Sequence, residues 1–265
     1  MKFSIITVCR NSAATLRATM QSLAEQTCRD YEWVVVDGAS TDDTLSLIST
    51  FEGPRGTWIS KPDKGIYNAM NKAARLARGD YVYFLNSDDC LIDHAVLADV
   101  AAELEARAAP DLIYGNVIYL HPAHRVLRKF EHISTATLPF EDLCHQASFA
   151  RRALFDSIGP FNERFSTNAD YDWLLRVFAS GATTHWMDRT VAEFRTGGAH
   201  MQNFSAAVEE RRAVRLQYMS PLTLALGDLG RRLRHRWHLL KTGQRPGQYA
   251  VNELNVHKEG ERDGA

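Results

Sequence analysis

The sequence predicts an α/β fold in which a mainly parallel sheet is flanked by helices. Over the first 120 or so residues, short apolar runs alternate with segments of helical periodicity, which is typical of strand–helix–strand units. The runs show little polar alternation, a pattern that favours strands covered on both faces. The 265 residues are 45% hydrophobic and 24% charged, which excludes a largely disordered chain and leaves enough sequence for a substantial core.

The predicted elements begin with a buried strand at residues 3–8. Asn11 and Ser12 then offer an N-cap for a helix, whose apolar residues recur at helical spacing as far as Ala24. The β-branched run at residues 32–36 predicts the second strand.

A polar loop over residues 37–44 leads into a helix predicted for 45–51, and a short strand is expected at 57–59. Between residues 66 and 77 the apolar residues fall at i, i+3, i+4, i+7, i+8 and i+11, which is one face of a helix. Arg78-Gly79 ends this helix, because a cation in the last turn and a glycine just beyond it are typical C-terminal signals.

The later part of the chain alternates less regularly. A strand at residues 81–85, a helix around 97–104 and a strand at 112–117 continue the pattern, and further helices are predicted over 170–180 and 204–219.

The chain divides into a predicted larger domain over residues 1–205 and a helical, basic extension over residues 206–265. The Gly-, Pro- and charge-rich tail that follows Lys241 is expected to fray.

Residues 231–241 of the extension contain five Lys or Arg residues and no acid, and Leu233, Trp237 and Leu240 form one apolar stripe. Two interpretations stay open. The segment lies in the interface of an anionic membrane, or it packs its stripe on the larger domain and solvates its arginines.

Charge and cysteine content exclude several classes of protein. The formal charge is 31 − 32 = −1, which gives no global argument for binding nucleic acid. No apolar run approaches the roughly 18 residues that span a bilayer, and the apolar start is too short for a signal peptide, so we expect a cytoplasmic protein. The cysteines are far apart and are expected to be reduced, with neither zinc nor disulfides; they are Cys9, Cys28, Cys90 and Cys144.

Polar clusters follow three predicted strands, at residues 7–11, 37–43 and 86–89. Ligands of open α/β sheets bind beyond the carboxyl ends of the parallel strands, so these clusters are candidates for a binding site. Asp88 and Asp89 are the most informative pair, because adjacent carboxylates repel one another unless a cation or solvent relieves them. Mg²⁺ or Mn²⁺ suits such oxygen ligands together with substrate phosphates. The sequence has neither a P-loop nor a G-x-G-x-x-G motif at these positions.

An ordered set of motifs over roughly residues 1–200 resembles the family 2 glycosyltransferases of bacterial polysaccharide synthesis, which have a GT-A fold; the nearest resemblance is to the colanic-acid-type branch. The matching segments are Ser4-Ile-Ile-Thr-Val with Asn11, Val34-Val-Val-Asp-Gly-Ala-Ser-Thr-Asp-Asp-Thr44, Asp63-Lys-Gly-Ile-Tyr-Asn-Ala-Met-Asn71, Arg78-Gly-Asp-Tyr-Val-Tyr-Phe-Leu-Asn-Ser-Asp-Asp89, His145-Gln146 and Asn168-Ala-Asp-Tyr-Asp-Trp-Leu-Leu-Arg176.

The resemblance implies a set of residues for the nucleotide-sugar donor. Asn86 and Asp88 stand where the family has the two aspartates of its D-x-D motif, so Asp88 would bind the metal, while Asn86 is better suited to a ribose or sugar contact. Asp89 either assists the metal or caps the next turn. The donor-side residues are Thr7, Arg10, Asn11, Asp37, Asp63, Lys64, Gly65, Asn86 and Ser87.

The resemblance also implies a catalytic base. Asp170 matches the aspartate of the family's Glu-Asp pair, although Ala169 replaces the glutamate, which makes Asp172 a competing candidate on the acceptor side. His145 and Gln146 would line the acceptor side as well. Taken alone, without the resemblance, Asp170 is better interpreted as a carboxylate that stabilises a helix N-terminus.

The resemblance implies a metal-dependent inverting glycosyltransferase that uses Mn²⁺ or Mg²⁺ and a nucleotide-diphosphate sugar. The expected acceptor is a saccharide, plausibly lipid-linked, for an exported polysaccharide, and the expected location is the cytoplasm with peripheral contact to the inner face of the membrane. Two other functions remain open: a nucleotidyltransferase, and a non-catalytic sugar-nucleotide-binding module.

Overall fold

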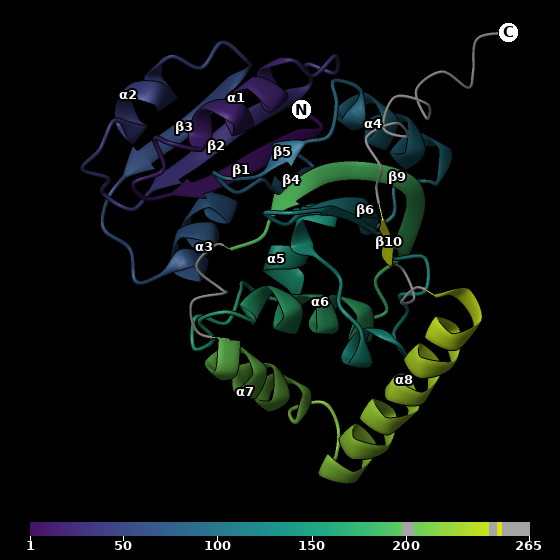
Figure 1. The fold of residues 1–265 in the computed structure, drawn as a ribbon. Helices are drawn as coiled ribbons and strands as arrows, with labels where there is room; N and C mark the ends of the chain where they lie inside the picture. The colour runs from purple at the N-terminus through teal and green to yellow at the C-terminus, as the bar shows by residue number, and fades with distance from the viewer. Residues whose placement is uncertain (198–203, 244–247, 251–265) are drawn as a thin grey trace, which may run out of the picture.

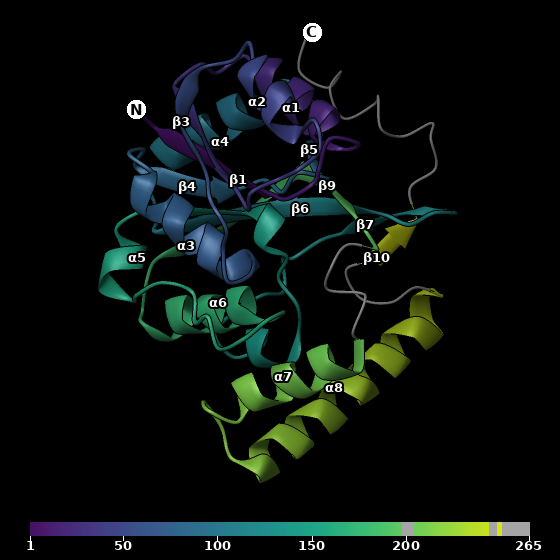
Figure 2. The same ribbon diagram turned by 90° about the vertical axis from the view of Figure 1, so that its left-hand side faces the viewer.

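The computed structural model describes residues 1–197, 204–243 and 248–250. In this part of the chain, ten strands join in one sheet that is covered by helices on both faces (Figures 1 and 2). The predicted α/β fold is confirmed.

The N-terminal half of the sheet is parallel. Its strands lie in the order β4-β1-β2-β3, and each adjacent pair runs parallel. Every residue of β1, β2 and β4 is buried, which explains why these strands show no polar alternation. The bounds are β1 (Phe3–Cys9), β2 (Tyr31–Asp37), β3 (Arg55–Ser60) and β4 (Tyr81–Phe84).

The second half of the sheet is antiparallel at all but one pairing. β8 joins β4 to β6, and β6 pairs with β7 antiparallel but with β9 parallel. The sheet as a whole is therefore mixed, and the predicted parallel arrangement applies to its N-terminal half. The bounds are β5 (Cys90–Leu91), β6 (Leu112–Leu120), β7 (Arg125–Arg128), β8 (Ser148–Arg151), β9 (Thr184–Arg195) and β10 (Gln248–Ala250), which pairs with β7.

Helices cover both faces of the sheet. Figure 2 shows α1, α2 and α4 on one side of the sheet, with α3, α5 and α6 on the other. The bounds are α1 (Leu16–Ala24), α2 (Thr44–Ser49), α3 (Ile66–Leu76), α4 (Val96–Ala106), α5 (Leu154–Ser157) and α6 (Ala169–Ala179), with short 3₁₀ turns η1 (Leu138–Phe140) and η2 (His145–Ala147).

The first helix starts later than predicted. Thr15 is the N-cap of α1, and the carbonyl of Ser12 accepts hydrogen bonds from the amides of Thr15 and Leu16. Asn11 and Ser12 therefore do not cap this helix. They belong to the loop after β1, where Asn11 has a positive φ of 51°.

The C-terminal extension consists of α7 (Phe204–Arg215) and α8 (Pro221–Thr242). Ser220 is the N-cap of α8, and its Oγ accepts a hydrogen bond from the Thr223 amide. Helix α8 packs closely at Gly227, where a Cβ would collide with the ring of Phe140. The tail predicted to fray lies mostly at residues 244–247 and 251–265, outside the described residues.

Two expectations about the whole chain are tested by the fold. All four cysteines are free, and Cys9 and Cys90 lie at the end of β1 and the start of β5. Among the residues that the structure describes, no helix is both long and apolar enough to cross a membrane.

Candidate active site

The loops that follow the parallel strands meet around Gly38. A Cβ added to Gly38 would lie 2.5 Å from Asp63 Oδ2 and 3.4 Å from the side chain of Arg10. The strand ends of β1, β2 and β3 thus bring Arg10 and Asp63 close to the same glycine. A methyl group at this position would require the Asp63 carboxylate to move.

Hydrogen bonds hold the first of these loops in place. The Asn11 amide donates to Ser40 Oγ at 2.7 Å, and Asn11 Oδ1 accepts from the Thr41 amide at 2.9 Å. Ser87 Oγ, which follows β4, donates to Ser12 Oγ at 3.0 Å. The polar residues after β1, β2 and β4 are far apart in the sequence, but these hydrogen bonds join them at one edge of the sheet. We call this edge the rim.

Asp37 is an internal carboxylate of this rim. It is fully buried, and its oxygens accept hydrogen bonds from the Ser40 amide and hydroxyl and from Ser60 Oγ. Burial raises the pKa of Asp37, but the hydrogen bonds from Ser40 and Ser60 outweigh it, so the pKa lies below its usual value. Asp37 is thus an ionised carboxylate that joins the ends of β2 and β3. Its predicted contact with the donor would have to compete with these hydrogen bonds.

Thr7 does not fit its predicted role as a donor contact. Its side chain is completely buried, its Oγ1 donates to the Leu85 carbonyl at 2.8 Å, and it accepts from Trp33 Nε1 at 3.0 Å. Both functions of the hydroxyl are used inside the sheet, so we correct the prediction: Thr7 is a structural residue.

The loop between β3 and α3 contains Asp63, Lys64 and Gly65, which were predicted to lie on the donor side. Asp63 is half-buried and its Oδ1 accepts a hydrogen bond from the Gly65 amide at 2.9 Å. Lys64 and Gly65 are exposed, and Gly65 is the N-cap of α3. Asp63 is therefore the member of this motif that faces the rim.

Asp89 is an anchor between three elements. It is buried, its Oδ2 accepts from Gln146 Nε2 at 2.9 Å, and its Oδ1 accepts from the Arg195 amide at 2.9 Å. Burial and the charge of the adjacent Asp88 raise the pKa of Asp89 to about 7. These contacts support the turn-fixing interpretation of Asp89 over the metal-ligand one.

Gln146 is likewise structural. It is buried, it donates to Asp89, and its Oε1 accepts from the thiol of Cys144 at 2.8 Å. The predicted place of Gln146 on the acceptor side is therefore wrong, because both ends of its amide are used internally.

Asp88 is the residue best placed to hold a divalent cation. It is half-buried and lies in the turn that follows β4. Two residues before it, Asn86 Oδ1 is buried without a hydrogen-bond partner among the described residues. In the described part of the chain, no group of three or more His, Cys, Asp and Glu side chains forms a metal site, and Asp88 as a metal ligand stays a prediction.

A row of four polar side chains runs from this turn to α6. His145 Nε2 lies 3.4 Å from Asn86 Nδ2, and His145 Nδ1 lies 2.7 Å from Asp170 Oδ2. Tyr67 Oη, from α3, donates to Asp170 Oδ1 at 2.8 Å. An ionised carboxylate only accepts hydrogen bonds, so the His145 proton lies on Nδ1. The structure thus brings together Asn86, His145 and Asp170, which were predicted separately.

Asp170 is held as a carboxylate. Burial raises its pKa, but the hydrogen bond and charge of His145, with the hydrogen bonds from Tyr67 Oη and the Tyr171 amide, bring the pKa below its usual value. Burial and the Asp170 charge raise the pKa of Tyr67 well above its usual range, so the tyrosine remains a donor.

Glu210 of α7 fixes the helix that carries Asp170. Its carboxylate accepts hydrogen bonds from the amides of Ser166, Thr167 and Asn168 at 2.5, 2.7 and 2.9 Å. These amides precede the first turn of α6, whose N-terminal N–H groups have no partner within the helix. A residue of the predicted C-terminal extension therefore holds the loop that leads into α6.

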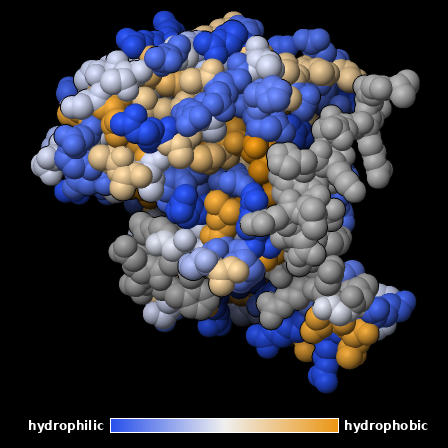
Figure 3. Space-filling model, turned by 45° about the horizontal axis from the view of Figure 1, so that its top comes forward, coloured by the Kyte–Doolittle hydropathy of each residue, from blue (hydrophilic) through white to orange (hydrophobic). Residues whose placement is uncertain are grey.

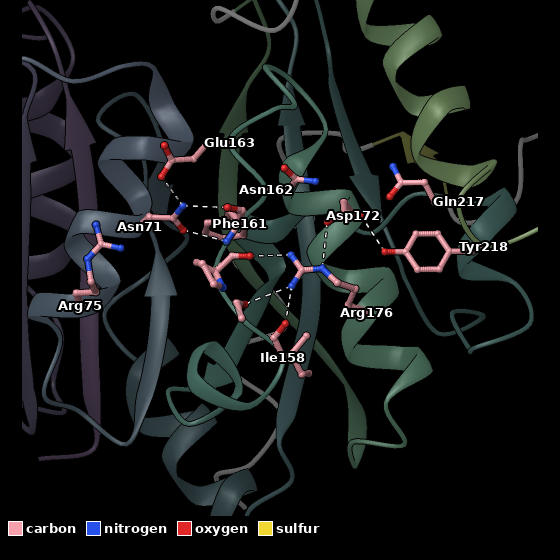
Figure 4. A pocket seen from close by; sticks show the side chains of 12 residues that line it. Asn71, Arg75, Ile158, Phe161, Asn162, Glu163, Asp172, Arg176, Gln217 and Tyr218 are labelled. Atoms are coloured by element: carbon pink, nitrogen blue, oxygen red, sulfur yellow. Dashed lines mark hydrogen bonds and ion pairs between the residues drawn. The ribbon is translucent and has the colours of Figure 1, made fainter.

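Asp172 lines a cavity of about 460 Å³ (Figure 4), and Asp170 is not among the residues that line it. The side chain is buried, its Oδ2 accepts from Arg176 Nε at 3.1 Å, and its Oδ1 accepts from Tyr218 Oη at 2.8 Å. Of the predicted donor and metal residues, all of which the structure describes, none lines this cavity. We therefore correct the prediction that Asp172 serves the acceptor.

Asp172→Asn is expected to lower the free energy of unfolding by about 2 kcal/mol, because it removes a charge-assisted hydrogen bond to Arg176. Donor hydrolysis by the folded protein should stay within about twofold of the unchanged protein. Urea unfolding and a hydrolysis assay measure the two effects. Asp156→Asn, at an exposed position in α5, is the matched control and should change neither. A large loss of activity at unchanged stability would contradict the structural role.

Two residues of the site escape the sequence analysis. Tyr67 belongs to the Asp-Lys-Gly-Ile-Tyr segment, yet its place on the apolar face of α3 is typical of a core residue. Glu210 lies in a charged helix with no nearby motif. The only signal for Tyr67 is that motif, and nothing local signals Glu210, since its partners lie more than 40 residues away.

The fold and the site together define a class of protein, the glycosyltransferases of GT-A fold. S. aureus TarS 1-349 in complex with UDP-GlcNAc matches this structure with a TM-score of 0.68 at 20% identity, covering 91% of this chain and 73% of that chain. The mannosyltransferase PcManGT from Pyrobaculum calidifontis, in complex with GDP-Man and Mn²⁺, matches with a TM-score of 0.59 at 17% identity, covering 93% and 77%.

Sequence comparison identifies the family. The family described as "Glycosyl transferase family 2" matches residues 4–159. A "PGL/p-HBAD biosynthesis glycosyltransferase" of Mycobacterium bovis (strain BCG / Pasteur 1173P2) is 40% identical over 200 residues, which cover 74% of this chain and 77% of the relative. The chain belongs to glycosyltransferase family 2, as its motifs predict, and this decides against a nucleotidyltransferase.

Proposed function

We propose that this glycosyltransferase inverts the anomeric centre of a nucleotide-diphosphate sugar in a single displacement. The observation that carries the proposal is the Tyr67–Asp170–His145–Asn86 row, because it places a fixed, ionised carboxylate beside the turn that follows β4. Asp170 removes the proton of the acceptor hydroxyl as the new bond forms, and no enzyme nucleophile is needed.

The donor is proposed to lie along the rim made by the strand ends. Arg10, Asp63 and Ser87 line the rim. Asn86 Oδ1 is buried and has no hydrogen-bond partner among the described residues, so it would accept a hydrogen bond from a ribose or sugar hydroxyl that reaches it. Asp88 would hold Mn²⁺ or Mg²⁺ against the diphosphate. When bound, such a cation offsets the negative charge that develops on the leaving group.

The proposed acceptor is a saccharide on a lipid carrier, used for a cell-surface polysaccharide or glycolipid on the cytoplasmic side of the membrane. The family assignment and the name of the mycobacterial relative, a PGL/p-HBAD biosynthesis enzyme, support this proposal. No nucleic-acid partner is proposed.

The test is a donor-hydrolysis and transfer assay with a panel of sugar nucleotides, chosen first by thermal shift, with and without Mn²⁺. Product anomers are assigned by NMR during the first turnovers. An inverted anomer is expected. A retained anomer would reject the single displacement, and thermal-shift binding with neither hydrolysis nor transfer would restore the non-catalytic alternative.

Tyr67→Phe is expected to move the acidic limb of the pH–rate profile upward by about one pH unit. The change removes a hydrogen bond that favours the Asp170 carboxylate, so the pKa of Asp170 rises and a higher pH is required to keep the base ionised. The pH dependence of kcat for transfer measures this shift, while KM for the donor should stay nearly constant.

Tyr81→Phe is the matched control for Tyr67→Phe. Tyr81 is also buried, but its Oη donates to the Pro110 carbonyl, away from the row. The acidic limb of the pH–rate profile of Tyr81→Phe should not move. Equal shifts in both variants would mean that Tyr67 acts only through overall stability.

A further inference from the structure

An exposed apolar stripe runs along almost the whole of α8. The six residues that form it occur at i, i+4, i+7, i+11, i+15 and i+18, and 52–79% of each is exposed; they are Leu222, Leu226, Leu229, Leu233, Trp237 and Leu240. The stripe is thus twice as long as residues 231–241 predict. Its exposure also contradicts the interpretation in which it packs on the larger domain.

The opposite face of α8 is the one that packs on the protein. Leu224 is buried, Gly227 lies against Phe140, Asp228 pairs with Arg215 at 2.8 Å, and His235 lies 3.2 Å from Glu141. At about 100° per residue, this packed face is centred about 180° from the stripe. The stripe therefore points outward along the full helix, and docking of α8 on the domain leaves it uncovered.

Cationic side chains border the stripe on both sides. Arg232 and Arg236 lie on one flank, while Arg234 and Lys241 lie on the other, and all four are exposed. Asp228 is the only acid in α8, and Arg215 neutralises it. In Figure 3 the lobe at the lower right, where Figure 1 places α8, shows apolar residues among strongly hydrophilic ones.

The cationic flanks distinguish between two partners that could cover the stripe: a second copy of the chain and an anionic lipid surface. In a second copy of the chain, pairing of two stripes would bring like-charged arginines together, whereas helix pairs usually place opposite charges at such positions. An anionic lipid surface satisfies both features, since the apolar stripe enters the acyl boundary and the flanking cations meet the headgroups. Trp237 suits this boundary because its ring is apolar and its N–H is polar.

We propose that α8 docks this glycosyltransferase on an anionic bilayer, with the stripe from Leu222 to Leu240 inserted parallel to the surface. The inference rests on α8 and not on the proposed reaction. It gives the enzyme a fixed orientation on the membrane, because the packed face ties α8 to η1 and α7.

The experiment is flotation of the full chain with vesicles of phosphatidylglycerol and phosphatidylcholine, compared with vesicles of phosphatidylcholine alone. Binding to the anionic vesicles is expected, and it should weaken as salt rises. Leu233→Ser combined with Trp237→Ser should weaken binding by at least about 100-fold, because two inserted side chains are lost. Arg232→Gln combined with Arg236→Gln should weaken it about 30-fold.

Val208→Ser is the matched control, since Val208 is an exposed apolar residue of α7 that is half accessible and lies outside the stripe. It should bind vesicles normally. Asp88→Ala should also bind normally, so a failure of the proposed reaction and a failure of docking are told apart. Equal binding to neutral vesicles, no binding at all, or a dimer in sedimentation that only the stripe variant dissociates would each overturn the proposal.

Discussion

Asp170→Asn is expected to lower the rate of sugar transfer by about 10²–10⁴-fold, the usual cost of removing a general base. The substitution keeps the size of the side chain, so the hydrogen bonds from Tyr67 and the Tyr171 amide can persist, while the charge that accepts the proton is lost. Transfer is measured under donor saturation, and donor affinity is measured separately by calorimetry. The affinity should be nearly unchanged, because Asp170 serves the acceptor.

Asp172→Asn provides the comparison for this experiment. The two carboxylates lie on the same helix, but Asp172 is bound to Arg176 and Tyr218 and faces another cavity. A larger loss of transfer for Asp172→Asn, at equal folded concentration, would reverse the assignment of the base. The pH profile gives an independent check, since a base with a lowered pKa stays ionised throughout the neutral and mildly acidic range.

Asp88→Ala is expected to abolish metal-stimulated turnover, with a loss of at least about 10³-fold, because the leaving diphosphate would no longer be neutralised. The fold should be retained, since Asp88 is only half-buried in a turn. Electron paramagnetic resonance of Mn²⁺ in the presence of nucleoside diphosphates reports the metal directly, and the variant should lose the bound-metal signal.

Asp80→Ala is the control for Asp88→Ala. Asp80 is exposed and precedes β4, whereas Asp88 follows it, so the two carboxylates lie at opposite ends of one strand. Asp80→Ala should retain turnover and the Mn²⁺ signal. Full activity of the unchanged enzyme in excess chelator would show that the metal assignment is wrong, whatever the variants do.

The sequence predicts the parallel half of the fold well, because three of its four strands are short, mainly apolar runs in which every residue is buried. The second half is harder to predict. β9 is a long strand with many half-exposed positions, and it pairs with β6 across about 70 residues of chain. A local pattern carries no information on such pairings. The strand predicted at residues 112–117 is β6, but its partners β8 and β9 are not predicted.

The site shows the same division. Polar residues at strand ends indicate where the rim lies, but they do not tell whether an oxygen faces a ligand or the core. The resemblance assigns roles to Thr7 and Gln146, whose side chains are bonded internally. The link from Tyr67 to Asp170 joins residues 103 positions apart. Such a contact follows from tertiary packing alone.

Glu210 also determines where this enzyme can be cut and recombined. A chimera joined after residue 205 would lose Glu210, and the helix that carries Asp170 would start with three uncapped amides. A junction at Ser220 keeps α7 with the catalytic part and exchanges the helix that bears the apolar stripe together with the chain that follows it, β10 included. The segment that can be exchanged between relatives therefore begins with α8. Such an exchange would change the surface that the enzyme binds and keep its active site.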